Sequence, residues 1–283
     1  MVVHSPLREQ AAPLIIRPSK GWTMLNLQEL WQYRELMFFL TWRDIKVRYK
    51  QTVLGGIWAV LQPFLTMIAF SIIFGKLVGV PSEGVPYPVF AYCALLPWQL
   101  FAYSLTESSN SVVANQNLIT KVYFPRLVIP LSTVLAGLVD FVIAFIVLVF
   151  MLGYYQIYPT LSSALMLPFF LFLCVCLATG AGVWLSALNV LYRDVRYTIP
   201  FLTQVWLFAT PIAYPSTLIP EPWRVLYGIN PMAGVVEGFR WALLGTGKAS
   251  GFMIVVSVAV TFVVLISGLY FFRRIERRFA DIV

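Results

Sequence analysis

The sequence predicts an all-α membrane protein with several membrane-spanning helices, and three observations support this prediction. Of its 283 residues, 60% are hydrophobic and only 11% are charged, whereas soluble domains have roughly 45–50% apolar and about 25% charged residues. The mean hydropathy is +0.81. The apolar residues also form blocks close to the about 20 residues that one helical crossing requires. We therefore expect lipid to surround most of the chain.

Six apolar blocks are predicted to be the crossings of one transmembrane domain over residues 26–283, which follows a cytoplasmic tail over residues 1–25. The blocks are Gly55–Phe74, Val89–Leu105, Leu127–Met151, Leu161–Leu188, Ile199–Ala213 and Phe252–Phe272. The fifth is the shortest and contains Pro200 and Pro211, which a span tolerates when neighbouring helices satisfy the freed carbonyls. Because the first block begins near Gly55, we expect no cleavable signal peptide.

The distribution of Lys and Arg predicts the orientation, because cytoplasmic loops carry the excess of these residues. One side of the predicted bundle holds only Lys76, Arg224, Arg240 and Lys248, and all other basic residues fall on the opposite side. Both termini are therefore predicted to be cytoplasmic, which requires an even number of crossings. The net charge of +8 is explained by topology, since the chain has too little polar surface for a nucleic-acid interface.

An amphipathic helix is predicted over residues 26–50, ahead of the first crossing. One face holds aromatic and apolar residues spaced 7, 4, 3 and 4 apart, and a second face holds basic residues. The members are Trp31, Phe38, Trp42, Ile45 and Tyr49 on the first face and Arg43, Lys46 and Lys50 on the second. This pattern is typical of a helix in the cytoplasmic membrane interface. An ordinary positively charged flank of the first crossing is the alternative.

Two connections on the predicted cytoplasmic side are candidate docking points for a soluble partner. Ser111–Tyr123 is polar and compatible with a helix that begins with Ser111 as the N-cap and stops at Pro125. The second connection is the short turn Asn189–Tyr197.

The outer connection Tyr214–Gly251 is too apolar for a solvated loop and is predicted to fold back into the membrane. Asn230 and Pro231 form a helix start, and Gly245 forms a stop after Met232–Leu244. That helix is too short to cross a membrane, so a re-entrant or interfacial position is expected. A second short helix is predicted over Pro222–Tyr227.

No motif for catalysis or cofactor binding is found in the sequence. A phosphate-binding Walker loop is excluded, because Gly75-Lys76 and Gly247-Lys248 lack the upstream glycine and the following hydroxyl residue. His4 and the cysteines Cys93, Cys174 and Cys176 do not have the arrangement of a tetrahedral metal site. We therefore expect a non-catalytic chain that binds no cofactor of its own.

Ionisable residues at membrane depth are functional candidates, and here they are Asp140 and Glu107. A hydrogen-bonded structural role between helices is favoured for Asp140, and snorkelling toward the interface explains Glu107. A small-residue stripe at Ala178, Gly182 and Ser186 predicts close packing of another helix, from the same chain or from a second copy.

Aromatic side chains in the predicted spans have two interpretations. They could line a channel and stack on sugar rings, or they could contact lipid. The candidate channel-lining residues are Trp58, Phe64, Phe201 and Phe208.

In combination, these features resemble the permease subunit of ABC exporters for polysaccharides, the family that moves lipid-linked O-antigen, capsule or teichoic acid chains. The similarity runs from about Leu27 to the C-terminus. The residues that carry it are Trp42–Lys50 (WRDIKVRYK), Leu54-Gly55, Trp58, Leu61–Pro63 (LQP), Leu118-Ile119, Lys121–Arg126 (KVYFPR) and Leu188–Val195 (LNVLYRDV).

The resemblance implies a homodimeric permease bound to two copies of a separate ATPase, which supplies the ATP and Mg²⁺ chemistry, with a channel for the glycan between the permease copies. It implies ATPase coupling by Asn115, Asn117, Lys121, Tyr123, Arg193 and Asp194. It also implies an outer gate on Pro222–Tyr227 and Pro231–Leu244 that includes Pro231, Glu237 and Arg240.

The polyprenyl pyrophosphate end of such a substrate is anionic, and a basic cluster could meet it at the inner leaflet. The cluster is Arg43, Lys46, Arg48 and Lys50. Anionic membrane lipids would be attracted by the same charges. The alternatives for the whole chain are an ABC exporter of drugs or small lipids, an ion-coupled secondary transporter and a structural membrane scaffold.

Overall fold

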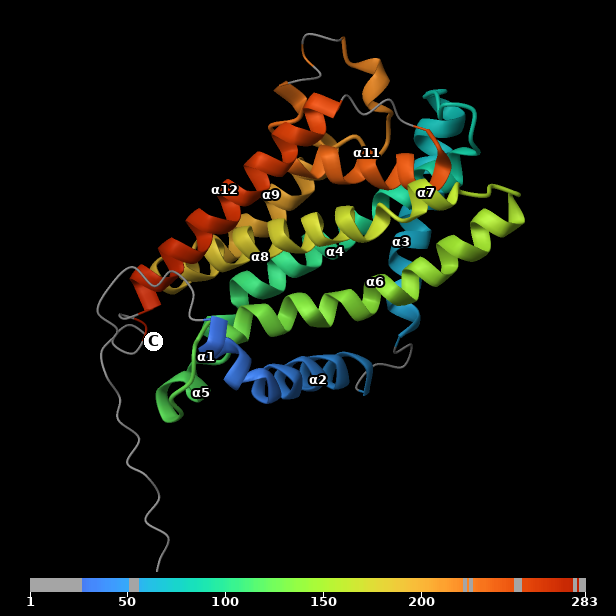
Figure 1. Cartoon of the computed structure of the whole chain (residues 1–283). Helices are drawn as coiled ribbons and strands as arrows, with labels where there is room; N and C mark the ends of the chain where they lie inside the picture. The colour runs from blue at the N-terminus through green and yellow to red at the C-terminus, as the bar shows by residue number, and fades with distance from the viewer. Residues whose placement is uncertain are drawn as a thin grey trace, which may run out of the picture.

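The computed structural model describes residues 27–50, 56–220, 223, 226–246, 251–276 and 279. Over these residues all regular structure is helical, as predicted (Figure 1). The predicted tail over residues 1–25 lies outside the described residues. The described elements are α1 (Leu27–Gln32), α2 (Arg34–Lys50), α3 (Ile57–Phe70), the π-helix η1 (Ser71–Leu77), α4 (Tyr87–Ala114), α5 (Gln116–Lys121), α6 (Val128–Tyr154), α7 (Leu161–Ala164), α8 (Leu167–Leu191), α9 (Val195–Ala209), the 3₁₀ turn η2 (Ser216–Leu218), α11 (Pro231–Leu244) and α12 (Gly251–Glu276).

Five helical segments in the described part of the chain are long and apolar enough to cross a membrane. They are Ile57–Val78, Tyr87–Ala114, Val128–Tyr154, Leu161–Leu191 and Gly251–Glu276, and they correspond to five of the six predicted blocks. The fifth predicted block forms α9, which has 15 residues and begins earlier, at Val195. At about 22 Å, α9 is shorter than the roughly 30 Å of a hydrocarbon core.

α4 is the central helix of the bundle, with α8 and α6 on either side (Figure 1). Over residues 87–105 it is largely apolar around its circumference, as expected of a helix enclosed by others, and Phe90, Tyr92 and Phe101 have no exposed surface. As a helix, α4 continues to Ala114, beyond the end of the predicted block at Leu105. Ser111 therefore does not cap a new helix; its hydroxyl donates to Ser108 O within α4, and Asn115 forms the junction with α5.

The small-residue stripe of α8 packs within the same chain. Ala178, Gly182 and Ser186 are all buried, and a Cβ added at Gly182 would lie 2.7 Å from the hydroxyl of Ser108 on α4. The small side chains therefore allow α8 and α4 to approach closely, which decides between the two neighbours that the sequence left open.

The bundle has two ends, which position all the candidate sites. At the α5 end, the last turns of α4 and α8 lie side by side. The Asn189 amide of α8 donates to Ser109 O (2.9 Å) and to Asn110 Oδ1 (3.0 Å) of α4. α12 finishes at the same end, where Glu276 accepts a hydrogen bond from the Arg126 amide. The α11 end is the opposite one, where α4 begins and where α7 and α11 lie (Figure 1).

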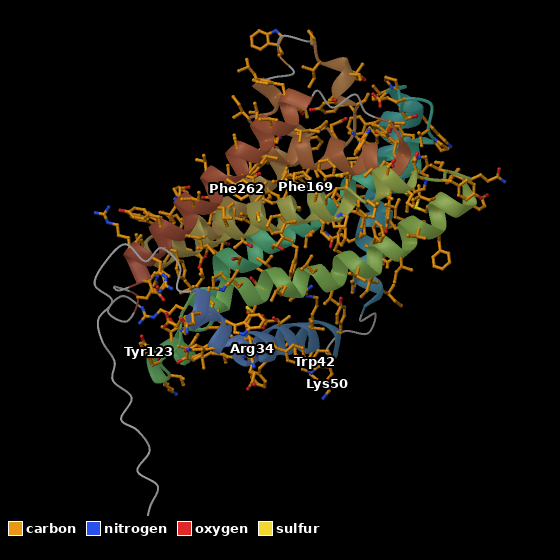
Figure 2. All side chains as sticks on the ribbon, in the orientation of Figure 1. Arg34, Trp42, Lys50, Tyr123, Phe169 and Phe262 are labelled. Atoms are coloured by element: carbon orange, nitrogen blue, oxygen red, sulfur yellow. The ribbon has the colours of Figure 1, made fainter. Side chains whose placement is uncertain are left out.

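The predicted amphipathic segment forms α1 and α2, with a break at Tyr33. α2 runs along α6: Leu40 is 1% exposed, and Thr41 Oγ1 donates to Ser132 O of α6 at 3.4 Å. Trp31, Phe38 and Trp42 of the predicted aromatic face are exposed, and Trp42 points away from the bundle in Figure 2. Tyr49 of the same face instead bonds Asp140 of α6.

α11 has the predicted boundaries. The Asn230 side chain accepts from Met232 N at 3.1 Å, Pro231 occupies the first turn, and Gly245 ends the helix with φ of +67°. Nearly every α11 residue is buried against α4, α8 and α12. The neighbouring Pro222–Tyr227 segment lies only partly within the described residues.

Candidate functional site

α5 projects from its end of the bundle and is held by one buried side chain. Ile119 is 6% exposed and packs in a cluster with Leu40 and Val112. Asn117, Lys121 and Tyr123, which were predicted to couple to an ATPase, are all exposed, and Tyr123 points outward in Figure 2. The polar surface of α5 is therefore accessible to a partner.

The second predicted coupling segment is at the same end of the molecule. Arg193 and Asp194 are exposed in the turn between α8 and α9. Asp194 O accepts the amide hydrogens of Tyr197 and Thr198, both at 3.1 Å, so the turn is continuous with the first turn of α9. Two exposed polar segments thus flank one end of the bundle.

Asn115 differs from the other coupling candidates because it is engaged within the chain. Its side-chain oxygen accepts from Arg43 Nη1 of α2 at 2.9 Å, and its amide donates to Ser111 O at 2.8 Å. Arg43 is also paired with Asp44 at 2.8 Å. The junction between α4 and α5 is therefore bonded to α2.

Further along α2, Arg48 and Tyr49 both bind Asp140 of α6. Arg48 forms an ion pair with one carboxylate oxygen, and the Tyr49 hydroxyl donates to the other. The Arg48 guanidinium also lies 4.0 Å from the centroid of the Tyr103 ring on α4. Burial raises the pKa of Tyr49, and the Asp140 carboxylate raises it further, so this phenol stays protonated and able to donate.

The sequence predicted a hydrogen-bonded structural role for Asp140, but it did not predict which residues bind the carboxylate. A carboxylate at membrane depth calls for a cation or donor nearby, and the basic segment over residues 43–50 was the nearest source. Glu107 lies on α4 one turn beyond Tyr103, is exposed, and is close enough to interact electrostatically with Arg48.

The four basic residues proposed to meet an anionic substrate therefore fall into two pairs. Arg43 and Arg48 are bonded to protein groups. Lys46 and Lys50 are exposed, and no carboxylate among the described residues forms an ion pair with either lysine. Figure 2 shows Lys50 pointing away from the bundle.

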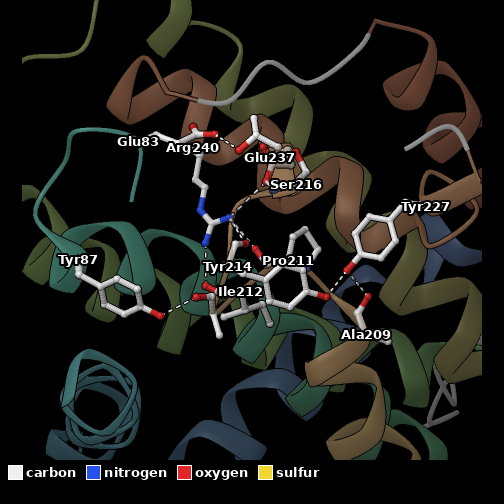
Figure 3. Close-up of polar contacts among 12 residues, drawn as sticks. Glu83, Tyr87, Ala209, Pro211, Ile212, Tyr214, Ser216, Tyr227, Glu237 and Arg240 are labelled. Atoms are coloured by element: carbon white, nitrogen blue, oxygen red, sulfur yellow. Dashed lines mark hydrogen bonds and ion pairs between the residues drawn. The ribbon is translucent and has the colours of Figure 1, made fainter. Parts of the chain in front are cut away.

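At the α11 end, α9 stops at Ala209 and the chain continues without helical geometry through Tyr214. The carbonyls that this break frees are bonded by side chains from later segments (Figure 3). Arg240 donates to Pro211 O at 2.6 Å and to Ile212 O at 2.7 Å. Tyr227 donates to Ala209 O at 2.6 Å. α9 is thus fixed to α11 at its C-terminal end.

Glu237 and Arg240, two of the predicted gate residues, are buried inside this network. Their side chains are 1% and 0% exposed and form an ion pair at 3.3 Å. Arg240 also lies 3.5 Å from the centroid of the Phe90 ring, and Glu237 accepts from the Ser216 amide. Their observed contacts hold backbone in place, and neither side chain faces an opening in the single chain.

The candidate channel-lining residues lie on the outside of the single chain. Phe201 and Phe208 of α9 are 67% and 55% exposed, and Trp58 and Phe64 of α3 are 50% and 37% exposed. An apolar pocket of about 440 Å³ lies between α9 and its neighbours α4 and α8. The lining residues are Leu105, Leu185, Ile199, Leu202, Val205, Trp206 and Ala209.

A family model described as ABC-2 type transporter matches residues 35–244, which include the α5 surface, the Asp140 cluster and α11. The chain belongs to the ABC-2 type transporter family. ABC-2 permeases are the non-catalytic membrane subunits of their transporters, and the ATPase is a separate subunit. The described residues contain no group of three or more His, Cys, Asp and Glu side chains that could hold a metal ion.

Several ABC-2 relatives are similar over most of their length. The chain is 32% identical to an O-antigen export system permease protein RfbA of Klebsiella pneumoniae over 249 residues, covering 88% of this chain and 95% of the relative. The RfbA protein of Myxococcus xanthus is also 32% identical, with 76% and 82% covered. The polysialic acid transport protein KpsM of Escherichia coli is 26% identical, with 83% and 91% covered.

Proposed function

We propose that this chain is the permease of an ATP-driven exporter that moves a lipid-linked polysaccharide, with O-antigen favoured, across the cytoplasmic membrane. The observation that carries this proposal is the 32% identity, over nearly the whole chain, to permeases named for O-antigen export. Similarity to a polysialic acid transport protein is lower but points to the same class of cargo.

The proposed assembly is a homodimer with two copies of a separate ATPase, which binds ATP and Mg²⁺. The channel forms between the two permease copies, lined by the exposed aromatic residues of α3 and α9. These surfaces are apolar and unpaired in the single chain, which is compatible with burial against a second copy.

The way the chain connects the two ends of the bundle supports the proposal of six crossings and two cytoplasmic termini. α8 stops at the α5 end and α12 begins at the α11 end, so α9 and the turns over residues 210–214 make the connection between the two ends. The basic residues also support this orientation, because Lys121, Arg126, Arg193, Arg196 and Arg274 gather at the α5 end, which positive charge marks as cytoplasmic.

The ATPase contacts the permease at α5 and at the Arg193-Asp194 turn. These two segments are exposed, polar and at one end of the bundle. A push on α5 during ATP-driven closure of the ATPase is carried into the bundle through Ile119 and through the Asn115 junction.

The anionic pyrophosphate of the substrate meets Lys46 and Lys50, which are the exposed cations of α2. Arg43 and Arg48 hold α2 in position, because they bind Asn115 and Asp140. The outer gate includes α11, where Glu237 and Arg240 fix the helix and the break after α9 in place.

The first test is co-purification of the proposed ATPase subunit with the full-length permease in detergent. The coupling variant carries Asn117→Ala, Lys121→Ala and Tyr123→Ala. The matched control carries Tyr154→Ala, Tyr158→Ala and Ser162→Ala, three exposed residues at the opposite end. We expect the wild type and the control to retain the ATPase and the coupling variant to lose it.

Cargo is tested by returning each variant to cells that lack the permease and measuring polysaccharide at the cell surface. Wild type and control restore the polysaccharide, and the coupling variant remains inserted in the membrane but inactive. If the wild type binds the ATPase but leaves surface polysaccharide absent, the cargo is wrong and a drug or small-lipid exporter is indicated. If no ATPase binds, the exporter proposal fails.

A further inference from the structure

We propose that Arg48 and Asp140 are positioning residues for transport, whose ion pair fixes α2 to the middle of α6 so that displacement of α5 reaches the interior of the bundle. The proposal rests on the function proposed above. It assigns a part in coupling to an ion pair that the function proposed above uses only to hold α2 in position.

The depth of Asp140 is the first observation. Asp140 is the thirteenth residue of α6, which runs from Val128 to Tyr154, so it lies about 18 Å from the start of that helix. A lone carboxylate at this depth in an apolar span is costly, and such residues pair with other groups and have functional roles. Both partners that bind Asp140, Arg48 and Tyr49, come from α2.

The second observation is that α2 is attached to α6 along its length. Leu40 is buried, Thr41 donates to Ser132 O of α6, and seven residues later Arg48 reaches Asp140. These contacts follow one side of α2 over two helical turns. Movement of α2 relative to α6 therefore has to break the ion pair or carry α6 with it.

The third observation is the connection from α2 to the proposed coupling surface. Arg43 donates to Asn115 at the junction of α4 and α5, and it lies five residues before Arg48 on the same helix. Displacement of α5 acts on Arg43 through this bond. α2 is therefore bonded both to the α5 junction and to the middle of α6.

A purely stabilising role explains the pair poorly. Side chains of Arg48 and Asp140 are 29% and 24% exposed, and partly or fully buried ion pairs often stabilise no more than apolar residues of similar volume. Their directional geometry suits them to fixing one relative position of two helices. Arg48 also contacts Tyr103 of α4, so three helices meet at one guanidinium.

The test compares charge reversals at the two positions in the complete complex with the ATPase. The variants are Arg48→Asp, Asp140→Arg and the double variant that exchanges both charges, with Asp140→Asn as a mild alternative. The control is Glu35→Lys, which changes an exposed charge on the same helix. Surface polysaccharide, ATP hydrolysis by the purified complex and ATPase co-purification are measured for each.

We expect each single reversal, and Asp140→Asn, to lower export at least about fivefold, which is the lower end of coupling between distant sites. ATPase binding and ATP hydrolysis should remain, so that ATP is consumed without export. The double variant should recover export, and Glu35→Lys should match the wild type.

Two results would overturn the proposal. One is normal export by Asp140→Asn at wild-type abundance in the membrane. The other is a double variant that inserts and binds the ATPase as well as the wild type but stays as inactive as the single reversals. Failure of the proposed function looks different, because the wild-type complex itself would then lack ATPase binding or polysaccharide export.

Discussion

Arg240 lies where α9 stops, and its guanidinium replaces hydrogen bonds that the helix no longer makes. Pro211 and Ile212 are buried, so their carbonyls cannot bind water, and a buried carbonyl without a partner is costly. The planar guanidinium reaches both carbonyls and Glu237 at once, a geometry that an ammonium group cannot reproduce. The sequence placed Arg240 on the short helix of the outer connection, as a gate residue, and gave no sign of these contacts.

Arg240→Met should lower the free energy of unfolding by about 3–5 kcal/mol, because it leaves Glu237 and the two carbonyls buried without their partner. Arg196→Met is the matched control, since Arg196 is exposed and a surface substitution usually stays within about 0.5 kcal/mol. Denaturant unfolding of the two purified proteins in detergent measures the difference. Equal stabilities would show that the network contributes little.

At the level of the elements, the backbones of α8 and α12 approach each other closely. Gly180 and Gly268 lie at the crossing, and a Cβ added at Gly180 would lie 2.5 Å from the Cα of Leu265. Small residues at helix crossings allow such contact in membranes, where packing replaces the hydrophobic effect as the driving force. The predicted stripe on α8 indicated close packing without naming its neighbour, which is α4, and it did not indicate this second contact on the opposite side of α8.

Gly180→Ala is expected to destabilise the protein by about 1–3 kcal/mol, the usual cost of overpacking. Gly153→Ala is the control within a helix, because no atom lies within 4 Å of the added Cβ, and alanine there should be neutral or stabilising by up to about 1 kcal/mol. Thermal unfolding in detergent compares the two substitutions. A loss of equal size at both positions would contradict the close crossing.

The elements also show where sequence reasoning succeeded and where it failed. The boundaries of α11 follow from local chemistry at Asn230, Pro231 and Gly245, and all three have the predicted roles. The end of α4 depends on tertiary packing instead. Ser111 was predicted to cap a new helix, yet it is buried within the bundle, as is Ser108, because α4 continues as a helix to Ala114.

For the whole molecule, composition was enough to predict a helical membrane protein, and block lengths were enough for five of its spans. The candidate site was less predictable, because Arg48 and Asp140 are 92 residues apart and only the packing of α2 on α6 brings them together. The number of crossings rests on α9, whose 15 residues are too few to identify a span by length alone.

Cysteine labelling of intact cells tests the direction of α9. Single substitutions are placed at Arg193, before α9, and at Leu218, after it, with Tyr158→Cys as the reference for the α11 end. Background labelling should be low because Cys93, Cys174 and Cys176 are buried.

If α9 crosses the membrane, a membrane-impermeant maleimide labels Leu218→Cys and Tyr158→Cys from outside. Arg193→Cys reacts only after permeabilisation, because its side carries the excess of positive charge. Labelling of Leu218→Cys only after permeabilisation would instead leave α9 on the cytoplasmic side and reduce the crossings to five.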